Sequence, residues 1–202
     1  MSNYDTGFFN LRGDTNIMAN NFEQMKKIGK EGEAVVETLL RNDDIVWGFE
    51  DVSEKDEWQG KDVDFLVLYE SDDGMLNDKT IEVKTDQMAG STGNFFVEAK
   101  IVYKHIKSLP EYVKKQIRKD DKGAFFRKGW AAGSAAEYFI EYVPKHEKLY
   151  IILAEDLRRY IVENNPEKKT KRDSANKTVH GWLIPIADLC SNYPVMIYDL
   201  EQ

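Results

Sequence analysis

Residues 81–86 of the chain read IEVKTD, and this stretch decides how the rest of the sequence is interpreted. Its β-branched residues favour an extended strand, in which successive side chains point to opposite faces of a sheet. The three apolar or β-branched side chains at 81, 83 and 85 therefore share one face, whereas Glu82 and Lys84 share the other. The sequence thus places an acid and a base together on a strand that its other residues anchor in the core.

The strand upstream of this stretch brings a second acid to the same face. Val63 to Tyr69 is an apolar run bounded by charge, which is typical of a buried strand, and residues 71–74 (SDDG) form a turn signal. The two strands are predicted to pair as a hairpin, with Asp64 across from Glu82 and Lys84. The plain alternative is a cross-strand ion pair on a solvated face.

This combination of side chains suits metal-assisted hydrolysis of a phosphodiester. Carboxylate oxygens bind Mg²⁺, which keeps several waters and takes other ligands from a substrate phosphate. A water activated by such a cation, and oriented by a neighbouring lysine, can attack phosphorus.

Asp64 followed by Glu82-Val83-Lys84 resembles the D…(D/E)-x-K signature of the PD-(D/E)XK, or restriction-endonuclease-like, nuclease superfamily. The resemblance covers roughly residues 29–153. It implies an α/β fold whose central mixed β-sheet is flanked by helices, in the order helix, three-strand meander, helix, strand, with the C-terminal residues as additions. The sequence departs from the signature at Val63, which replaces the proline and makes Asp62 a rival ligand.

The resemblance also implies a role for each residue of the catalytic set. Asp64 and Glu82 would bind the metal, Mg²⁺ or Mn²⁺, with the Val83 carbonyl as a further ligand. Lys84 would orient the attacking water. Glu33, from the helix that precedes the first strand, would be an auxiliary metal ligand.

That helix is predicted from Asn21 to about Arg41. Asn21 and Gln24 have the spacing of a capping box, and apolar residues follow with a period of 3.6. On a helical projection Glu33 lies at the edge of the apolar stripe and can face the sheet, whereas Glu37 points to solvent.

The sequence assigns no role to Asp86 or Glu98. The remaining helices and strands are predicted from the same patterns. Strands are expected at Ile45–Val52, residues 95–100, Tyr138–Val143 and Leu149–Leu153, helices at Leu109–Arg118 and Glu155–Glu163, polar loops at Ser53–Lys61 and Glu167–Lys177, and a strand with a short helix between His180 and Tyr198.

Composition limits the class of protein. With 202 residues and 42% hydrophobic content, we expect a polar, flexible arm over residues 1–20 and one domain over residues 21–202. Cys190 is the only cysteine, so no internal disulfide can form. The sequence has no long apolar span, no signal peptide at its start and no phosphate-binding G-x-x-x-x-G-K-[ST] motif. A cytoplasmic protein without a membrane partner or a nucleotide cofactor is expected.

The net charge of −8 is unevenly distributed. Residues 43–73 contain twelve acids and two bases, a local charge of −10, so the rest of the chain carries +2. Basic side chains near a cleft would contact nucleic-acid phosphates. The predicted nucleic-acid-binding residues are Lys168, Lys169, Lys171, Arg172 and Lys177. The alternative for this segment is a solvated loop, and a second basic stretch, residues 100–119, leaves the same two interpretations open.

The sequence therefore predicts a Mg²⁺-dependent deoxyribonuclease, an endonuclease that hydrolyses DNA phosphodiester bonds. Many nucleases of this superfamily cut two strands as dimers, so a homodimer is an open expectation. Two alternatives remain: a nuclease fold that binds nucleic acid or protein without catalysis, and an α/β protein in which Glu82 and Lys84 form only an ion pair.

Overall fold

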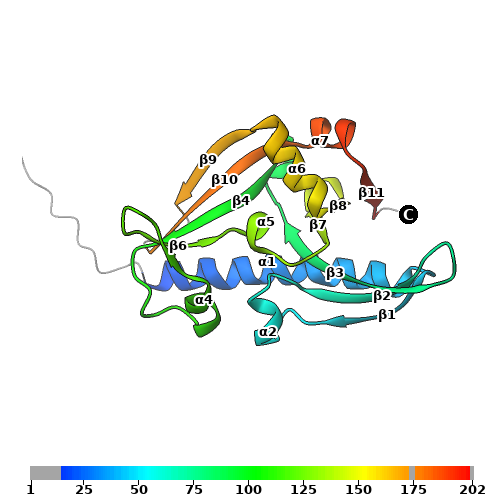
Figure 1. Ribbon diagram of the computed structural model, residues 1–202, viewed down its shortest axis with the longest axis horizontal. Coiled ribbons are helices and arrows are strands. Elements are labelled where there is room, and N and C mark those ends of the chain that lie inside the picture. Colours follow the sequence, from blue (N-terminus) through cyan, green and yellow to red (C-terminus); the bar gives the residue numbers. More distant parts are fainter. Residues whose placement is uncertain (1–14, 173–175, 201–202) are drawn as a thin grey trace, which may run out of the picture.

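The structure is a computed structural model that describes residues 15–172 and 176–200. Within these residues the chain forms two β-sheets, one long helix and several short helices (Figure 1). The fold is α/β with a mixed sheet flanked by helices, as predicted. The second sheet was not predicted.

The mixed sheet has the strand order β1-β2-β3-β7-β8-β11 within the described residues. Its strands are β1 (Val46–Asp51), β2 (Phe65–Glu70), β3 (Leu76–Thr85), β7 (Tyr138–Val143), β8 (Lys148–Leu153) and β11 (Val195–Asp199). The first three strands form an antiparallel meander, and β7 then pairs with β3 in parallel. The hairpin of β2 and β3 predicted from the sequence is confirmed.

The second sheet is antiparallel and has the order β5-β6-β4-β10-β9 over the same part of the chain. Its strands are β4 (Asn94–Tyr103), β5 (Arg118–Lys119), β6 (Phe125–Lys128), β9 (Glu167–Arg172) and β10 (Lys177–Pro185). The chain enters this sheet after β3, returns to the mixed sheet at β7, and enters the antiparallel sheet again at β9.

The helices differ greatly in length. They are α1 (Thr15–Asn42), α2 (Asp56–Gln59), α3 (Ala89–Thr92), α4 (Glu111–Gln116), α5 (Trp130–Gly133), α6 (Ala154–Asn164) and α7 (Ile186–Asn192), with a 3₁₀ turn, η1, at Pro144–His146. Among the described residues, no helix combines the length and the apolar character needed to cross a membrane.

Helix α1 covers one face of the mixed sheet. Val36 and Leu40 of α1 pack against Ile81 and Val83 of β3, and all four side chains are buried. Gly32 allows the closest approach: a Cβ atom at this position would lie 2.1 Å from the Thr85 hydroxyl oxygen. The absence of a side chain at Gly32 is therefore what brings the helix down onto the end of β3.

The opposite face of the mixed sheet packs against the antiparallel sheet. Phe139 and Ile152 of the mixed sheet share one buried cluster with Phe95 and Val97 of β4. Trp130 of α5 belongs to this cluster and packs edge-on against Phe139, with ring centroids 4.9 Å apart. Trp130 is thus a core residue, and the site described below lies in this layer between the sheets.

Several boundaries predicted from the sequence are wrong. Helix α1 begins at Thr15, so residues 15–20 are helical and Asn21 is not its N-cap. The rest of the expected arm, residues 1–14, lies outside the described residues. The predicted loop Ser53–Lys61 contains the short helix α2, and the helix predicted at Leu109–Arg118 is reduced to the six residues of α4.

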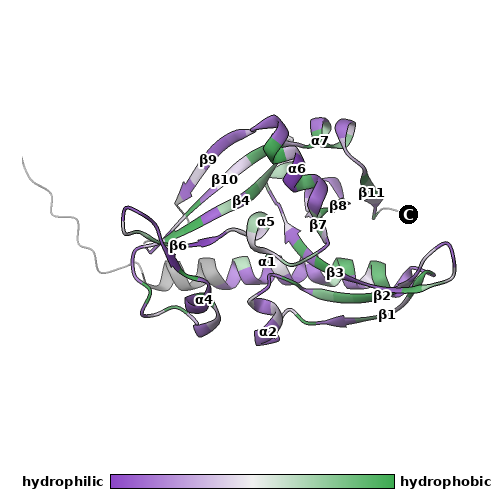
Figure 2. Ribbon diagram, viewed as in Figure 1, coloured by the Kyte–Doolittle hydropathy of each residue, from purple (hydrophilic) through white to green (hydrophobic). Residues whose placement is uncertain are grey.

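The basic segment predicted as a loop is also corrected. Residues 167–172 form β9, which pairs with β10 along its whole length. The sequence of this segment, EKKTKR, hid the strand because it has no apolar face. Figure 2 shows hydrophilic residues along β9, in contrast with the hydrophobic β2. Such a composition is typical of an edge strand, where charge prevents pairing with other chains.

The close contact at Gly32 gives a testable expectation. Gly32→Ala should lower the free energy of unfolding by about 1–3 kcal/mol, because the added methyl group overlaps Thr85. Gly29→Ala, on the same helix, has no atom within 4 Å of the added Cβ and should instead stabilise the protein by up to about 1 kcal/mol. Urea denaturation measures both. Equal effects of the two substitutions would contradict the packing of α1 described above.

Candidate active site

Strand β3 holds Glu82 and Lys84 on the face opposite to α1. Glu82 is 3% exposed, and the Lys84 ammonium forms an ion pair with Glu82 Oε1. Lys84 Nζ also lies 5.9 Å from the centre of the Trp130 ring. The prediction that these two side chains share a face is confirmed. Glu82 is buried between the two sheets, whereas the Lys84 side chain is 32% exposed.

Asp64 lies beside this pair at the start of β2. Its backbone is held on both sides: Val52 N–H donates to the Asp64 carbonyl at 2.8 Å, and Asp64 N–H donates to the Ile81 carbonyl at 2.8 Å. Its side chain is held as well, because Val83 N–H donates to Asp64 Oδ2 at 2.7 Å. These bonds fix the carboxylate next to Glu82 and Lys84.

The buried charges perturb one another. Burial raises the pKa of Glu82 to about 8, opposed by the Lys84 ammonium and reinforced by the carboxylates of Asp64 and Asp62. Burial likewise raises the pKa of Asp64, with Lys84 and the Val83 N–H acting in the opposite direction. For Lys84, burial favours proton loss, but the nearby carboxylates outweigh it and raise its pKa, so the side chain is a protonated ammonium.

One acid of the site was missed in the sequence. Glu141 on β7 is paired in register with Lys84 of the parallel neighbour β3, and it is 2% exposed. Burial raises the pKa of Glu141 to about 8, and the Asp86 carboxylate adds to this effect. Glu82 was identified as an acid within an apolar strand, and Glu141 shows the same pattern because it interrupts the apolar run YFIEYV.

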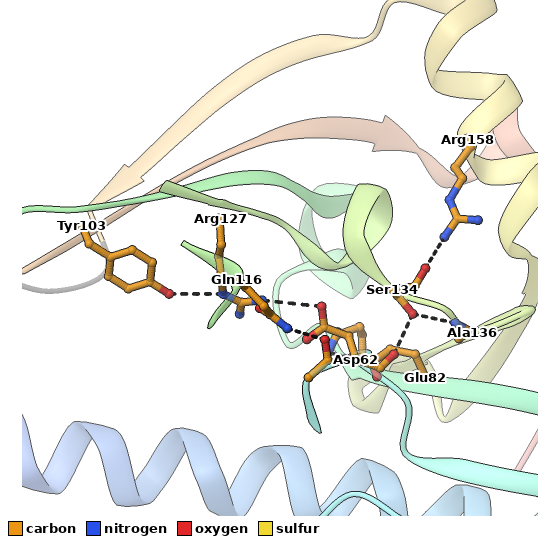
Figure 3. Close-up of polar contacts among 10 residues, drawn as sticks. Asp62, Glu82, Tyr103, Gln116, Arg127, Ser134, Ala136 and Arg158 are labelled. Carbon is orange, nitrogen blue, oxygen red and sulfur yellow. Dashed lines mark hydrogen bonds and ion pairs between the residues drawn. The ribbon is translucent and has the colours of Figure 1, made fainter. Parts of the chain in front are cut away.

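Asp62, the rival ligand, has a different partner. Asp62 Oδ2 lies 3.5 Å from Arg127 Nη1, and the Asp62 carbonyl accepts a hydrogen bond from the Ser134 hydroxyl at 2.6 Å (Figure 3). Its backbone has a φ of +49°, in the left-handed region that Asp tolerates better than most residues. Arg127 gave no signal in the sequence, because nothing in the run FFRK indicates that β6 approaches the acids.

Glu33 of α1 lies on the Asp64 side of the site. It accepts a hydrogen bond from Lys30 Nζ at 2.7 Å, and Lys30 also donates to the Ser53 hydroxyl at 3.0 Å. The side chain of Glu33 is 18% exposed, and its charge contributes to the raised pKa of Asp64. Glu37 pairs with Arg41 at the helix surface, as the helical projection predicted.

The two acids whose roles were open now have positions. Asp86 accepts hydrogen bonds from the backbone N–H groups of Met88, Ala89 and Phe96, so it caps the start of α3 and joins it to β4. Its role is structural. Glu98 of β4 adds a small effect to the pKa of Arg127 and of Glu141, after the larger effects of burial and of Asp62 or Asp86.

The basic residues predicted to bind nucleic acid lie on the edge of the antiparallel sheet. Strands β10 and β4 separate β9 from β6, the strand that contacts Asp62. Lys168, Lys169 and Lys171 are exposed, the side chain of Arg172 lies outside the described residues, and Lys177 is the first residue of β10. The fold therefore does not bring this group beside Asp64 and Glu82.

Comparisons with models of protein families, with curated proteins and with solved structures found no significant match to this chain. Among the described side chains, no group of three or more His, Cys, Asp or Glu residues is arranged to hold a metal ion. Asp64 and Glu82 are the two acids of the site that lie beside Lys84.

The raised pKa of Glu141 predicts how stability depends on pH. A carboxyl group that binds its proton more tightly in the folded protein stabilises the fold at low pH, and this contribution is lost as the pH rises through about 8. As the pH rises from 5 to 9 without divalent cations, the unaltered protein should lose this contribution, whereas Glu141→Gln has no such group to ionise. The free energy of unfolding of the variant, relative to that of the unaltered protein, should therefore increase by on the order of 2 kcal/mol over this range.

Chemical denaturation across this pH range measures the difference. Glu155→Gln is the matched control, because Glu155 is exposed on α6 and the same change of charge there should leave the pH profile unaltered. Identical profiles for the Glu141 variant and the unaltered protein would show that Glu141 is ionised in the folded state at ordinary pH.

Proposed function

We propose that this protein is a metal-dependent nuclease that hydrolyses DNA phosphodiester bonds as an endonuclease. The observation that carries the proposal is the Glu82 carboxylate. One of its oxygens pairs with Lys84, while Oε2 is buried and has no hydrogen-bond partner among the described residues. A buried, unpartnered carboxylate oxygen is costly, and a bound cation would satisfy it.

The titration of the acids around Glu82 supports the same proposal. Four acidic side chains share this region with two cations, Lys84 and Arg127. The acids are Asp62, Asp64, Glu82 and Glu141. Burial raises the pKa of Glu82 and of Glu141 to about 8, so a divalent cation that binds at Glu82 would displace a proton and pair with the ionised carboxylate.

The residues present fit Mg²⁺ or Mn²⁺. Asp64 offers the oxygen that does not accept the Val83 N–H, and Glu82 offers Oε2. Two carboxylates are the usual protein contribution to a Mg²⁺ site that shares a substrate phosphate. The Val83 carbonyl would be a further ligand, and Glu33 would act as an auxiliary ligand once released from Lys30.

A divalent cation held there would stabilise the negative charge that develops on the phosphate and lower the pKa of a water molecule. The chain's own residues would supply orientation. Lys84, held between Glu82 and the Trp130 ring, would donate a hydrogen bond to the attacking water or to a phosphate oxygen. The Val83 N–H would keep the Asp64 carboxylate aligned, and both groups come from a rigid strand.

The order of the elements supports a restriction-endonuclease-like core for this site. A helix is followed by an antiparallel meander whose second and third strands carry the acids, and β7 then joins β3 in parallel. The chain departs from the expected order between β3 and β7, where strands of the second sheet and three short helices replace one long helix.

A second candidate is a nuclease-like fold that binds nucleic acid or protein without catalysis. The ion pairs Glu82–Lys84 and Glu33–Lys30 favour it, because each acid already has a cation beside it. Titration calorimetry separates the two candidates: a nuclease should bind Mg²⁺ or Mn²⁺ through Asp64 and Glu82, whereas a non-catalytic module should release no heat with either ion.

The direct test is a cleavage panel of duplex, single-stranded and branched DNA, and of RNA, with Mg²⁺, Mn²⁺ or EDTA. Cleavage should require the metal, and Lys84→Ala should reduce its rate by about 10²-fold or more, because the water loses the group that orients it. Lys79→Ala is the control, since Lys79 lies on the same strand but pairs with Glu137 at the surface. Cleavage that survives both Lys84→Ala and Glu82→Ala would refute the proposal.

A further inference from the structure

A cleft adjoins the acids on the side of the antiparallel sheet. It has a volume of about 340 Å³ and is formed by the loop before β2, helix α4, and strands β5 and β6 with the end of α5. The lining residues are Gly60, Asp62, Lys115, Gln116, Arg118, Lys128 and Gly133. Three of these carry a positive charge, and one carries a negative charge.

The three cations of the cleft lie on its exposed rim and, among the described residues, form no close ion pair. Lys115, Arg118 and Lys128 are exposed and form no ion pair with any described carboxylate. Their neighbours behave differently: Lys61 pairs with Glu57, Lys100 with Asp120, and Lys114 with Glu111. The cations that line the cleft are therefore available for an external anion.

Asp62 connects the cleft to the carboxylate site. It lines the cleft, and Figure 3 draws its side chain next to that of Glu82. A Cβ atom on Gly133 would lie 3.8 Å from Asp62 Oδ2 and 3.1 Å from the Lys128 Cβ, so a side chain at position 133 would crowd the cleft wall.

Arg127 holds the cleft in a fixed position relative to the acids. It pairs with Asp62, and its guanidinium donates to Tyr103 Oη at 3.2 Å and to Gln116 Oε1 at 3.4 Å (Figure 3). Gln116 in turn donates to the Gly60 carbonyl. This network ties α4 and β6 to the loop that carries Asp62, and it neutralises the acidic group on the cleft wall.

We propose that this cleft binds the phosphate backbone of the nucleic acid, with Lys115, Arg118 and Lys128 contacting phosphates next to the one that is cut. The inference rests on the proposed function, because it takes its ligand from the reaction assigned to Asp64 and Glu82. The negatively charged backbone of a nucleic acid is repelled by the carboxylates of Asp64 and Glu82. Cations beside these acids offset this repulsion. Exposed cations on a rigid support fix the register of a strand without reading its sequence.

The test compares two triple substitutions that remove the same charge. One is Lys115→Ala with Arg118→Ala and Lys128→Ala; the other is Lys168→Ala with Lys169→Ala and Lys171→Ala on β9. Both are made in the Lys84→Ala background, so that the probe stays intact. Fluorescence anisotropy with labelled single-stranded and duplex DNA, in Mg²⁺ and over a range of salt concentrations, gives the dissociation constants.

The cleft variant should bind DNA at least about 30-fold more weakly at low salt. A plot of the logarithm of the association constant against the logarithm of the salt concentration should also become shallower by about 2–3, the value for three lost phosphate contacts on duplex DNA. The β9 variant should stay within about threefold of the parent. The reverse ranking, or an absence of DNA binding by the parent and by the unaltered chain, would overturn the inference.

Cleavage assays keep this inference separate from the proposed function. With Lys84 restored, a cleft variant that cleaves and binds like the unaltered chain refutes the cleft and leaves the nuclease proposal standing. Conversely, if the unaltered chain binds DNA through the cleft but cleaves no substrate with any metal, the nuclease proposal fails while the cleft assignment stands. Thermal unfolding of each variant confirms that the substitutions leave the fold intact.

Discussion

The alternation of side chains along β3 is the constraint on which the rest of the structure depends. One face of this strand packs against α1 and closes a hydrophobic core, which requires Gly32 to lie directly on Thr85. Because the period of a strand is two, that packing forces Glu82 and Lys84 into the layer between the sheets. The core that stabilises the fold thus also determines where its charges are buried.

This arrangement places ionisable groups in the interior at a cost in stability. Two acids with pKa values near 8, Glu82 and Glu141, are kept in the interior instead of apolar residues of similar size. A ligand that binds only the folded protein recovers such a cost through mass action. On the proposed function, the cation would therefore both enable hydrolysis and stabilise the folded chain.

The sequence predicted those parts of the fold that have a clear period. Strands with apolar faces, the hairpin of β2 and β3, and the approximate extent of α6 follow from local pattern, as does the shared face of Glu82 and Lys84. Strand β9 was missed because it has no apolar face, and its pairing depends on the free edge of β10. Arg127 and the basic cleft were missed because they come from elements distant in the chain, which only the tertiary fold brings beside Asp62.

The path of the chain between the two sheets has a consequence for how the site is assembled. The chain leaves the mixed sheet after Thr85 and returns at Tyr138, so the parallel pairing of β3 with β7 closes a loop that contains β4, β5 and β6. Closing such a loop costs chain entropy before any contact compensates for it. Glu82 and Asp64 meet within one hairpin, whereas Glu141 and the cleft join them only when both sheets are complete. No contiguous fragment shorter than residues 33–141 therefore contains all the acids of the candidate site. Formation of the site is coupled to the folding of the whole domain.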